Sequence, residues 1–322
     1  MPSPEFLGSI RDLDHQLGED DIRLPPRLLL KPALGRVGKL IDLSENPTSL
    51  TAWLQGATVA ACDGSRLEFG PFYPHTLLLQ RAMAIVSNSS ETLAEVDCCS
   101  PLLPTPAQEI EELARNKSMS AADAYPRWIQ KKLASLEVKI AAQAIKKWQP
   151  RLLLLDGGLL LFDTLPGWPE LVSLARDSQT LLVGVIEEIA TAELAPLLGI
   201  TDSRYYDREV LYGLLERGEA LILDSEHSIK KDYRTAFTRF SSRPAAAACD
   251  FLPDTNDEDI NNCLNLLYAT TGQTGRGIPF LIDLVDRKVR ITRQEGEVLL
   301  KMGLSANTYE KFFASQRSNR NI

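Results

Sequence analysis

The feature that most restricts the fold is a short apolar run, Arg151–Leu155, that ends in Asp156-Gly157-Gly158. The run is too short for a helix and does not alternate apolar with polar residues, so it predicts a central strand covered on both faces. Such strands occur in α/β proteins, where helices pack on both sides of the sheet. We therefore expect an α/β fold with an acidic residue at the end of a central strand.

The segments around this run predict a mixed sheet. Before it come Thr58–Cys62, Arg66–Gly70 and Thr76–Val86, all extended, then a proline-punctuated connector at 101–106 and a long helix, Ala122–Trp148. After it, strands and helices alternate, and the last third is helical. This order predicts a central sheet with helices on both faces. The later elements are strands at Thr180–Ile186, Ala220–Asp224 and Tyr233–Phe240, and helices at Trp168–Asp177, within Ala190–Gly218, and at Asp257–Thr271, Ile278–Ile291 and Arg293–Met302.

The composition divides the chain into three parts. Residues 1–50 are rich in proline, leucine and arginine and show no clear strand pattern, which predicts a helical or irregular N-terminal extension. Residues 51–310 form the single α/β domain, and residues 311–322 form a C-terminal tail. Within the extension, the apolar segment Leu24–Leu40 is a candidate contact surface for a partner or for a second copy of the chain.

The bulk properties exclude several classes of protein. No apolar run approaches the roughly 20 residues of a membrane span. The N-terminus lacks a basic segment followed by an apolar one, so we expect a cytoplasmic protein. The five cysteines form no CxxC pair, which predicts reduced, mostly buried thiols rather than a zinc site. A net charge of −8 argues against a protein that coats DNA, but a nuclease site built from carboxylates is itself acidic.

Two aspartates follow buried strands and are the first candidate site residues. Asp63 shares one strand face with Val59 and Ala61, and Asp156 ends the apolar run. Both precede a glycine, which lets the chain turn and a ligand approach closely. A single Asp-Gly pair is more often a turn or a helix cap. Two such pairs at one edge of a sheet would instead create the oxygen-only site that hard divalent cations prefer.

Two acidic residues on helices complete the candidate set. Glu137 lies near the centre of the apolar stripe of the long helix, where it needs either a cation or a basic partner such as Arg151. Asp286 borders the apolar stripe of a later helix, where it could also be an ordinary surface residue paired with Arg290 at i+4.

The order of these four carboxylates along the chain suggests phosphodiester hydrolysis. An aspartate on the first strand, a glutamate on a helix, an aspartate after a later strand and an aspartate on the last helix follow the order of RNase H-like nucleases. Two cations bridged by Asp63 and Asp156, with Glu137 and Asp286 completing their coordination, would stabilise both the attacking and the leaving oxygen.

Five segments in this order resemble the NurA nuclease domain, over about Ala57 to Leu304. They are VAACDGSR from Val59, LASLEVKIA from Leu133, LLLLDGGLL from Leu152, LLVGVIEE from Leu181 and PFLIDLVDR from Pro279. The resemblance implies an RNase H-like fold and a nuclease that uses manganese, with magnesium as the alternative cofactor. Asp63, Glu137 and Asp156 match the metal ligands of the family.

The resemblance also implies a biological setting. Members of this family cleave single-stranded and duplex DNA ends, as 5′–3′ exonucleases and single-strand endonucleases, in DNA end processing and double-strand break repair. They form homodimers and work with the hexameric ATPase HerA. We therefore expect DNA, a HerA-like ATPase and a second copy of the chain as partners.

Three positions depart from the family pattern: Glu187 replaces a lysine, Ile278 a tyrosine and Asp286 a histidine. Without the lysine, Arg66 and Arg287 are the candidates for contact with the scissile phosphate. These departures leave two alternatives open. One is a catalytically weakened, DNA-binding partner subunit of a HerA-like ATPase. The other is an RNase H-like hydrolase that acts on RNA or on hybrid duplexes.

A cluster of basic residues surrounds one predicted strand. As a solvated surface it needs no explanation, but alternate members could line a DNA groove through phosphate contacts. Its members are Lys230, Lys231, Arg234, Arg239 and Arg243.

Overall fold

The computed structural model describes residues 3–21, 24–200, 205–228, 230 and 232–314. The chain divides into two compact units, each built from two segments. The first unit comprises Met1–Glu45 and Ile186–Ile278, and the second comprises Asn46–Val185 and Pro279–Ile322. Most of the segment expected to be an N-terminal extension clusters with Ile186–Ile278.

The sheet of the second unit has the mixed arrangement that the sequence predicts. Strands β2 (Val59–Phe72), β3 (His75–Val86) and β4 (Thr92–Cys99) pair antiparallel. Strands β5 (Leu152–Asp156) and β6 (Leu181–Ile186) continue the sheet parallel to β2. The order across this part of the sheet is β6-β5-β2-β3-β4, which confirms the RNase H-like α/β prediction.

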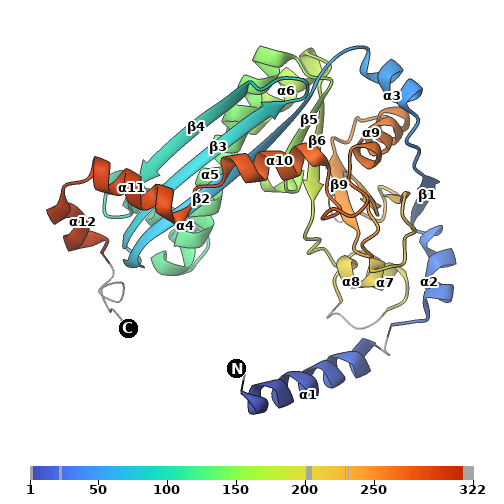
Figure 1. Cartoon of the computed structure of the whole chain (residues 1–322), viewed down its shortest axis with the longest axis horizontal. Helices are drawn as coiled ribbons and strands as arrows, with labels where there is room; N and C mark the ends of the chain where they lie inside the picture. The colour runs from blue at the N-terminus through green and yellow to red at the C-terminus, as the bar shows by residue number, and fades with distance from the viewer. Residues whose placement is uncertain (1–2, 22–23, 201–204, 229, 231, 315–322) are drawn as a thin grey trace. The chain divides into compact units, whose positions relative to one another are not determined.

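Helices cover both faces of this sheet. The long helix α5 (Ala121–Trp148) begins after the capping Ser120, whose side chain accepts from the Asp123 N–H, and ends at Gln149 in the left-handed region. It contacts β2, β3 and β4, whereas α10 (Phe280–Val289) contacts β2 and β3. Figure 1 shows α10 passing across the front of these strands, with α5 behind them.

Apolar clusters on the two faces hold these helices. On the α5 side, helix α4 (Pro104–Asn116) packs with α5 against Leu78 and Cys99. On the other side, Phe69 and Leu77 pack against the C-terminal helices. The remaining helices of the unit are α3 (Pro47–Leu54), the 3₁₀ turn η1 (Leu159–Leu161), α6 (Trp168–Asp177), α11 (Arg293–Gly303) and α12 (Ala306–Phe312).

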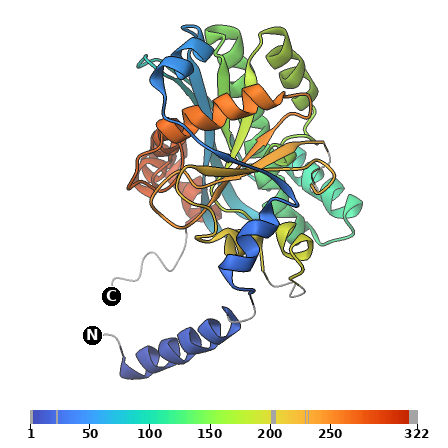
Figure 2. The ribbon, with the colours of Figure 1, turned by 90° about the vertical axis from the view of Figure 1, so that its right-hand side faces the viewer.

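The first unit is an antiparallel sheet with short helices. Its strands are β1 (Gly38–Asp42), β7 (Glu219–Leu223), β8 (Arg234–Thr238) and β9 (Ala247–Phe251), paired in that order. An apolar cluster that includes Leu34, Leu211 and Phe237 forms its core. Its helices are α1 (Pro4–Asp21, dark blue in Figure 2), α2 (Arg27–Leu34), α7 (Leu194–Leu197), α8 (Asp207–Leu211) and α9 (Asp257–Ala269). None of the helices that the structure describes has the length and hydropathy of a membrane span.

Three strands and two helices differ from the sequence prediction. Strand β1 lies in the segment expected to contain no strand, and β4 and β9 were not predicted. Helix α4 replaces the expected connector. Its prolines lie in the first turn, where a helix tolerates them because the N–H groups that proline lacks would have no partner within the helix. Helix α12 was likewise missed, and residues 315–322 of the expected tail lie outside the described residues.

Three members of the basic cluster around β8, Lys230, Arg234 and Arg239, are buried or half-buried, whereas Arg243 is exposed. Lys230 is buried, and its Nζ lies 2.8 and 2.9 Å from the two carboxylate oxygens of Asp250, which also accepts from the Thr235 hydroxyl. Arg234 donates to the Thr255 carbonyl at 2.6 Å, and Arg239 donates to three backbone carbonyls. Lys231 lies outside the described residues. Most of these cations therefore hold loops of the first unit in place.

Candidate metal centre

Asp63 and Asp156 occupy matching positions on neighbouring parallel strands. The last registered pair of β2 and β5 is Cys62 with Leu155, so the next residues along the two strands are Asp63 and Asp156. Residues at matching positions of a parallel pair point to the same face of the sheet. The predicted convergence of these two side chains is therefore a direct result of the strand register.

Asp63 lies inside β2 and not at a turn, contrary to the sequence interpretation. The strand continues through Asp63 and Gly64, which pair with Met83 and Ala82 of β3. At Asp156 the interpretation is correct, because Gly157 follows with a φ of 110° and its N–H donates to the Val185 carbonyl at 2.8 Å. Only glycine adopts this backbone conformation without strain.

The environment of Asp63 disfavours its charged form. The side chain is only 8% exposed. The pKa of Asp63 is raised to about 7, mainly by burial and also by the carboxylates of Asp156 and Asp286, although the Gly64 N–H that donates to Oδ1 at 2.6 Å acts in the opposite direction. Acidic groups from β5 and α10 therefore both lie within electrostatic range of Asp63 on β2.

Glu137 joins this group from α5. It is 7% exposed, and burial followed by the charges of Asp63 and Asp156 raises the pKa of Glu137 to about 8. A Cβ on Gly64 would lie 2.1 Å from Glu137 Oε1 and 2.8 Å from the Leu133 side chain. Glycine at position 64 is thus required for the close approach of Glu137 to β2. The sequence interpretation assigned this glycine to a turn and missed the contact.

The alternative partner that the sequence offered for Glu137, Arg151, lies elsewhere. Arg151 precedes β5, whereas Asp156, whose charge acts on Glu137, is at the other end of that strand. The guanidinium of Arg151 instead stacks over the Trp53 ring at 5.3 Å and donates to the Gln179 carbonyl at 3.5 Å.

Asp286 combines both roles that the sequence left open. One carboxylate oxygen lies 3.6 Å from Arg290 Nη2, which is the expected pair at i+4. Its charge also raises the pKa of Asp63, so the same carboxylate lies within range of the buried acidic group. Asp283 of the same helix is half-buried and accepts from Arg287 Nη2 at 2.7 Å.

Arg66 and Arg287, the two arginines expected to contact the scissile phosphate, are both exposed. Arg287 is exposed and bonded to Asp283. Arg66 is exposed on β2 opposite Gln80, and by alternation along the strand it lies on the face opposite to Asp63. In the first unit, Glu187, expected to stand in place of a family lysine, accepts from Arg276 Nε at 3.2 Å, and Ile278 is buried.

The donor set fits a hard divalent cation. Asp63, Glu137, Asp156 and Asp286 offer only carboxylate oxygens, which magnesium and manganese prefer over nitrogen or sulfur. Burial and mutual repulsion disfavour ionisation of Asp63 and Glu137, and a bound cation would reverse both effects. The carboxylates would therefore ionise as the cation binds.

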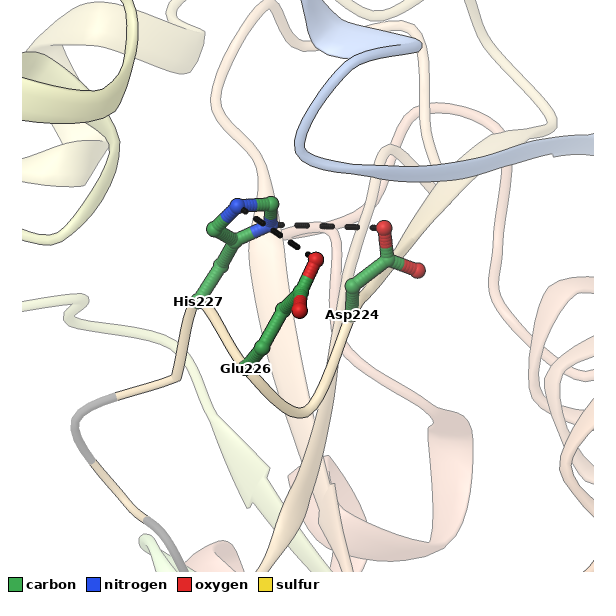
Figure 3. Close-up of side chains that lie close together, drawn as sticks. All are labelled: Asp224, Glu226 and His227. Atoms are coloured by element: carbon green, nitrogen blue, oxygen red, sulfur yellow. Dashed lines mark ion pairs between the residues drawn. The ribbon is translucent and has the colours of Figure 1, made fainter.

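Asp224, Glu226 and His227 form a second group of ligand types in the first unit. Figure 3 shows their side chains in the turn after β7. One ligand atom of each lies within 4.8 Å of the others, and the His227 ring nitrogens lie 4.0 Å from Asp224 and from Glu226. Asp224 and Glu226 are exposed to water, where acidic groups are common without a cation, so we assign this group no role.

The fold matches solved structures of NurA proteins. The NurA nuclease from Sulfolobus solfataricus is 13% identical, with a TM-score of 0.58 over 96% of this chain and 98% of that one. NurA with manganese is 12% identical, with a TM-score of 0.52 over 92% and 99%. NurA bound to dAMP and manganese is 12% identical, with a TM-score of 0.50 over 97% and 99%.

Sequence comparison identifies the family. No curated protein matches the chain. The family model of the NurA domain matches residues 57–291, which is more than half of the chain and includes β2, α5, β5 and α10. The chain therefore belongs to the NurA family of nucleases.

Proposed function

We propose that this chain is a DNA nuclease that depends on a divalent cation held by Asp63, Glu137, Asp156 and Asp286. The observation that carries the proposal is that Glu137, Asp156 and Asp286, from α5, β5 and α10, each lie within electrostatic range of the buried Asp63 of β2. Such a group is costly to keep without a function, because burial and like charges both oppose its ionisation.

The four residues differ in what they contribute. When bound, divalent cations stabilise charge on the attacking and leaving oxygens of a phosphodiester. Asp63 and Asp156, at matching positions of adjacent strands, can offer oxygens to the same ion. Glu137 is held against the backbone of Gly64, which orients its carboxylate. Asp286 adds a donor from the opposite helix layer.

Manganese is the proposed cofactor, with magnesium as the alternative. Two of the similar structures contain manganese, and one also contains dAMP. The manganese supports a divalent-cation cofactor, and the deoxynucleotide supports DNA as the substrate of this chain. By resemblance to the family, we extend the proposal to 5′–3′ exonuclease and single-strand endonuclease activity on DNA ends, in the repair of double-strand breaks.

The proposed partners are a HerA-like ATPase and a second copy of the chain, in the cytoplasm. Exposed apolar side chains in the N-terminal segment support such contacts. Phe6, Ile10, Leu13 and Leu17 of α1 recur at intervals of three and four residues and are more than half exposed, as are Leu28 and Leu29 of α2.

One observation favours a second candidate function. Glu187 stands where the family carries a lysine, and its carboxylate is paired with Arg276. A chain without that lysine is consistent with a weakened nuclease that binds DNA as a subunit of the ATPase assembly. Both candidates share the fold and differ in turnover.

The test compares the parent with Asp63→Asn and with Asp177→Asn, an exposed carboxylate at the end of α6, as the matched control. Labelled single-stranded DNA, duplex DNA, RNA and hybrid duplexes are incubated with manganese, magnesium or EDTA. We expect the parent and the control to cleave DNA with manganese, and Asp63→Asn to resemble the EDTA sample.

Equal cleavage by the parent and Asp63→Asn would refute the proposed site. Cation-dependent DNA binding without cleavage by the parent would favour the weakened subunit, and faster cleavage of hybrids would favour the RNase H-like alternative.

A further inference from the structure

Arg81 of β3 lies on the face of the sheet that carries Asp63. Arg81 pairs in register with Ser65 of β2, and Ser65 follows Asp63 by two residues. Residues two apart on a strand share a face, and residues opposite each other on paired strands do so as well. Arg81 and Ser65 therefore face the same helix layer as Asp63, which contains α10 and Asp286.

The end of α10 is bonded to these two residues. The last carbonyl groups of a helix have no partner within the helix. Arg81 Nε donates to the Val289 carbonyl at 2.9 Å, and Nη2 donates to the Arg290 carbonyl at 2.7 Å. The next backbone N–H, that of Ile291, donates to Ser65 Oγ at 3.1 Å. Three successive residues at the end of α10 are thus joined to the sheet.

The same guanidinium also reaches α11. Arg81 Nη1 donates to Glu295 Oε1 at 3.0 Å, so one side chain bonds three acceptors on two consecutive helices. The side chain is 21% exposed, which limits competition by water. Its charge lies at the C-terminal end of α10, where a cation is favourable. Only the planar guanidinium presents several donors in fixed directions, and a lysine cannot replace it.

These contacts set the position of Asp286. Asp286 precedes Val289 by three residues, which is less than one helical turn, so the two residues lie on the same side of α10. The contact of Asp286 with Arg290 cannot fix the helix, because it lies on α10 itself and Arg290 is 64% exposed. Among the described residues, Arg81 and Ser65 make the hydrogen bonds that join the end of α10, close to Asp286, to the sheet.

We propose that Arg81, assisted by Ser65, is a positioning residue of the cation site, which holds the end of α10 so that Asp286 stays beside Asp63. This inference rests on the proposed function, because it assigns Asp286 to the same site. Arg81 itself does not bind the cation in this arrangement, because it is positively charged and has no acceptor atom; three of its N–H groups donate to α10 and α11.

The test is a double-mutant cycle in the full-length chain, with the affinity for manganese measured by calorimetry. We expect Arg81→Met to weaken manganese binding by about 10- to 100-fold, as for other residues that orient metal ligands. In an Asp286→Asn background, Arg81→Met should change the affinity by less than about twofold, since it acts through Asp286. Arg81→Lys should behave like Arg81→Met, because one ammonium cannot make the three contacts.

Two further variants separate positioning from general damage to the fold. Arg293→Met is the matched control: it removes an arginine of α11 that stacks over Phe69 at 4.7 Å, and it should leave the manganese affinity unchanged. Ser65→Ala removes a single hydrogen bond and should weaken binding by about two- to tenfold. It keeps the inference testable if Arg81→Met does not fold.

Unchanged manganese affinity in both Arg81→Lys and Ser65→Ala would overturn the inference. So would equal effects of Arg81→Met with and without Asp286→Asn, because Arg81 would then not act through Asp286. Failure of the proposed function has a different signature: Asp63→Asn would bind manganese and cleave DNA as the parent does. Loss of binding in Asp63→Asn together with parental affinity in the Arg81 and Ser65 variants would overturn the inference alone.

Discussion

Replacing Glu137 with glutamine is expected to stabilise the protein in the absence of cations. The carboxyl is buried beside Asp63 and Asp156, and these surroundings raise the pKa of Glu137 to about 8. In the unfolded chain the same group ionises near its ordinary value of 4.5. As the pH rises from 5 to 8, the unfolded state therefore releases its proton first, and the folded state loses stability relative to it. Glutamine keeps the shape of the side chain but does not ionise, so it removes this loss of stability with rising pH.

The pKa difference sets the scale of the change. A pKa of about 8 in place of 4.5 corresponds to about 3 kcal/mol at pH 7, where the folded group still keeps most of its proton. Glutamine also introduces an N–H₂ group, which must find an acceptor in the same space. We therefore expect Glu137→Gln to raise the free energy of unfolding by about 1–3 kcal/mol at pH 7.

The assay is urea unfolding in EDTA between pH 5 and pH 8.5. The parent should lose stability as the pH rises, and Glu137→Gln should lose clearly less. Glu310→Gln, which changes an exposed glutamate of α12, is the matched control and should follow the parent. Manganese should stabilise the parent more than Glu137→Gln, since the variant lacks one donor.

Two results would refute this reasoning. One is a lower free energy of unfolding for Glu137→Gln than for the parent at pH 8. The other is an equal dependence of stability on pH in the two proteins, which would show that Glu137 ionises in the folded state as it does in the unfolded chain.

Three other predictions follow from close contacts and from exposure. Gly64→Ala should lower stability by about 1–3 kcal/mol in thermal unfolding, because the new methyl group meets Glu137 Oε1, and adding Glu137→Asp should restore part of the loss. Lys230→Met should lower stability by about 3–5 kcal/mol, because the buried carboxylate of Asp250 would lose its ion pair with Lys230, whereas Lys230→Met with Asp250→Asn should lie closer to the parent. Leu13→Ser on α1 should change the free energy of unfolding by less than about 0.5 kcal/mol, because the side chain is exposed. The same variant should self-associate less than the parent in gel filtration. Self-association equal to that of the parent would argue against α1 as a contact surface.

The sequence alone predicted the elements whose signals are local. The apolar run before Asp156 predicted β5, and the apolar stripe around Glu137 predicted α5. The same patterns singled out Asp63, Glu137, Asp156 and Asp286, because a charged residue on an apolar surface is visible without coordinates.

Only the tertiary structure decided the features that depend on distant partners. Strand β1 forms because Gly38–Asp42 pairs with β7, and Asp63 and Gly64 remain extended because β3 pairs with them. The approach of Glu137 to Gly64 and the contacts of Arg81 with the end of α10 join residues far apart in the chain. No local pattern encodes such contacts. Periodicity specifies which face of an element is buried, and the pairing of strands and helices determines what that face meets.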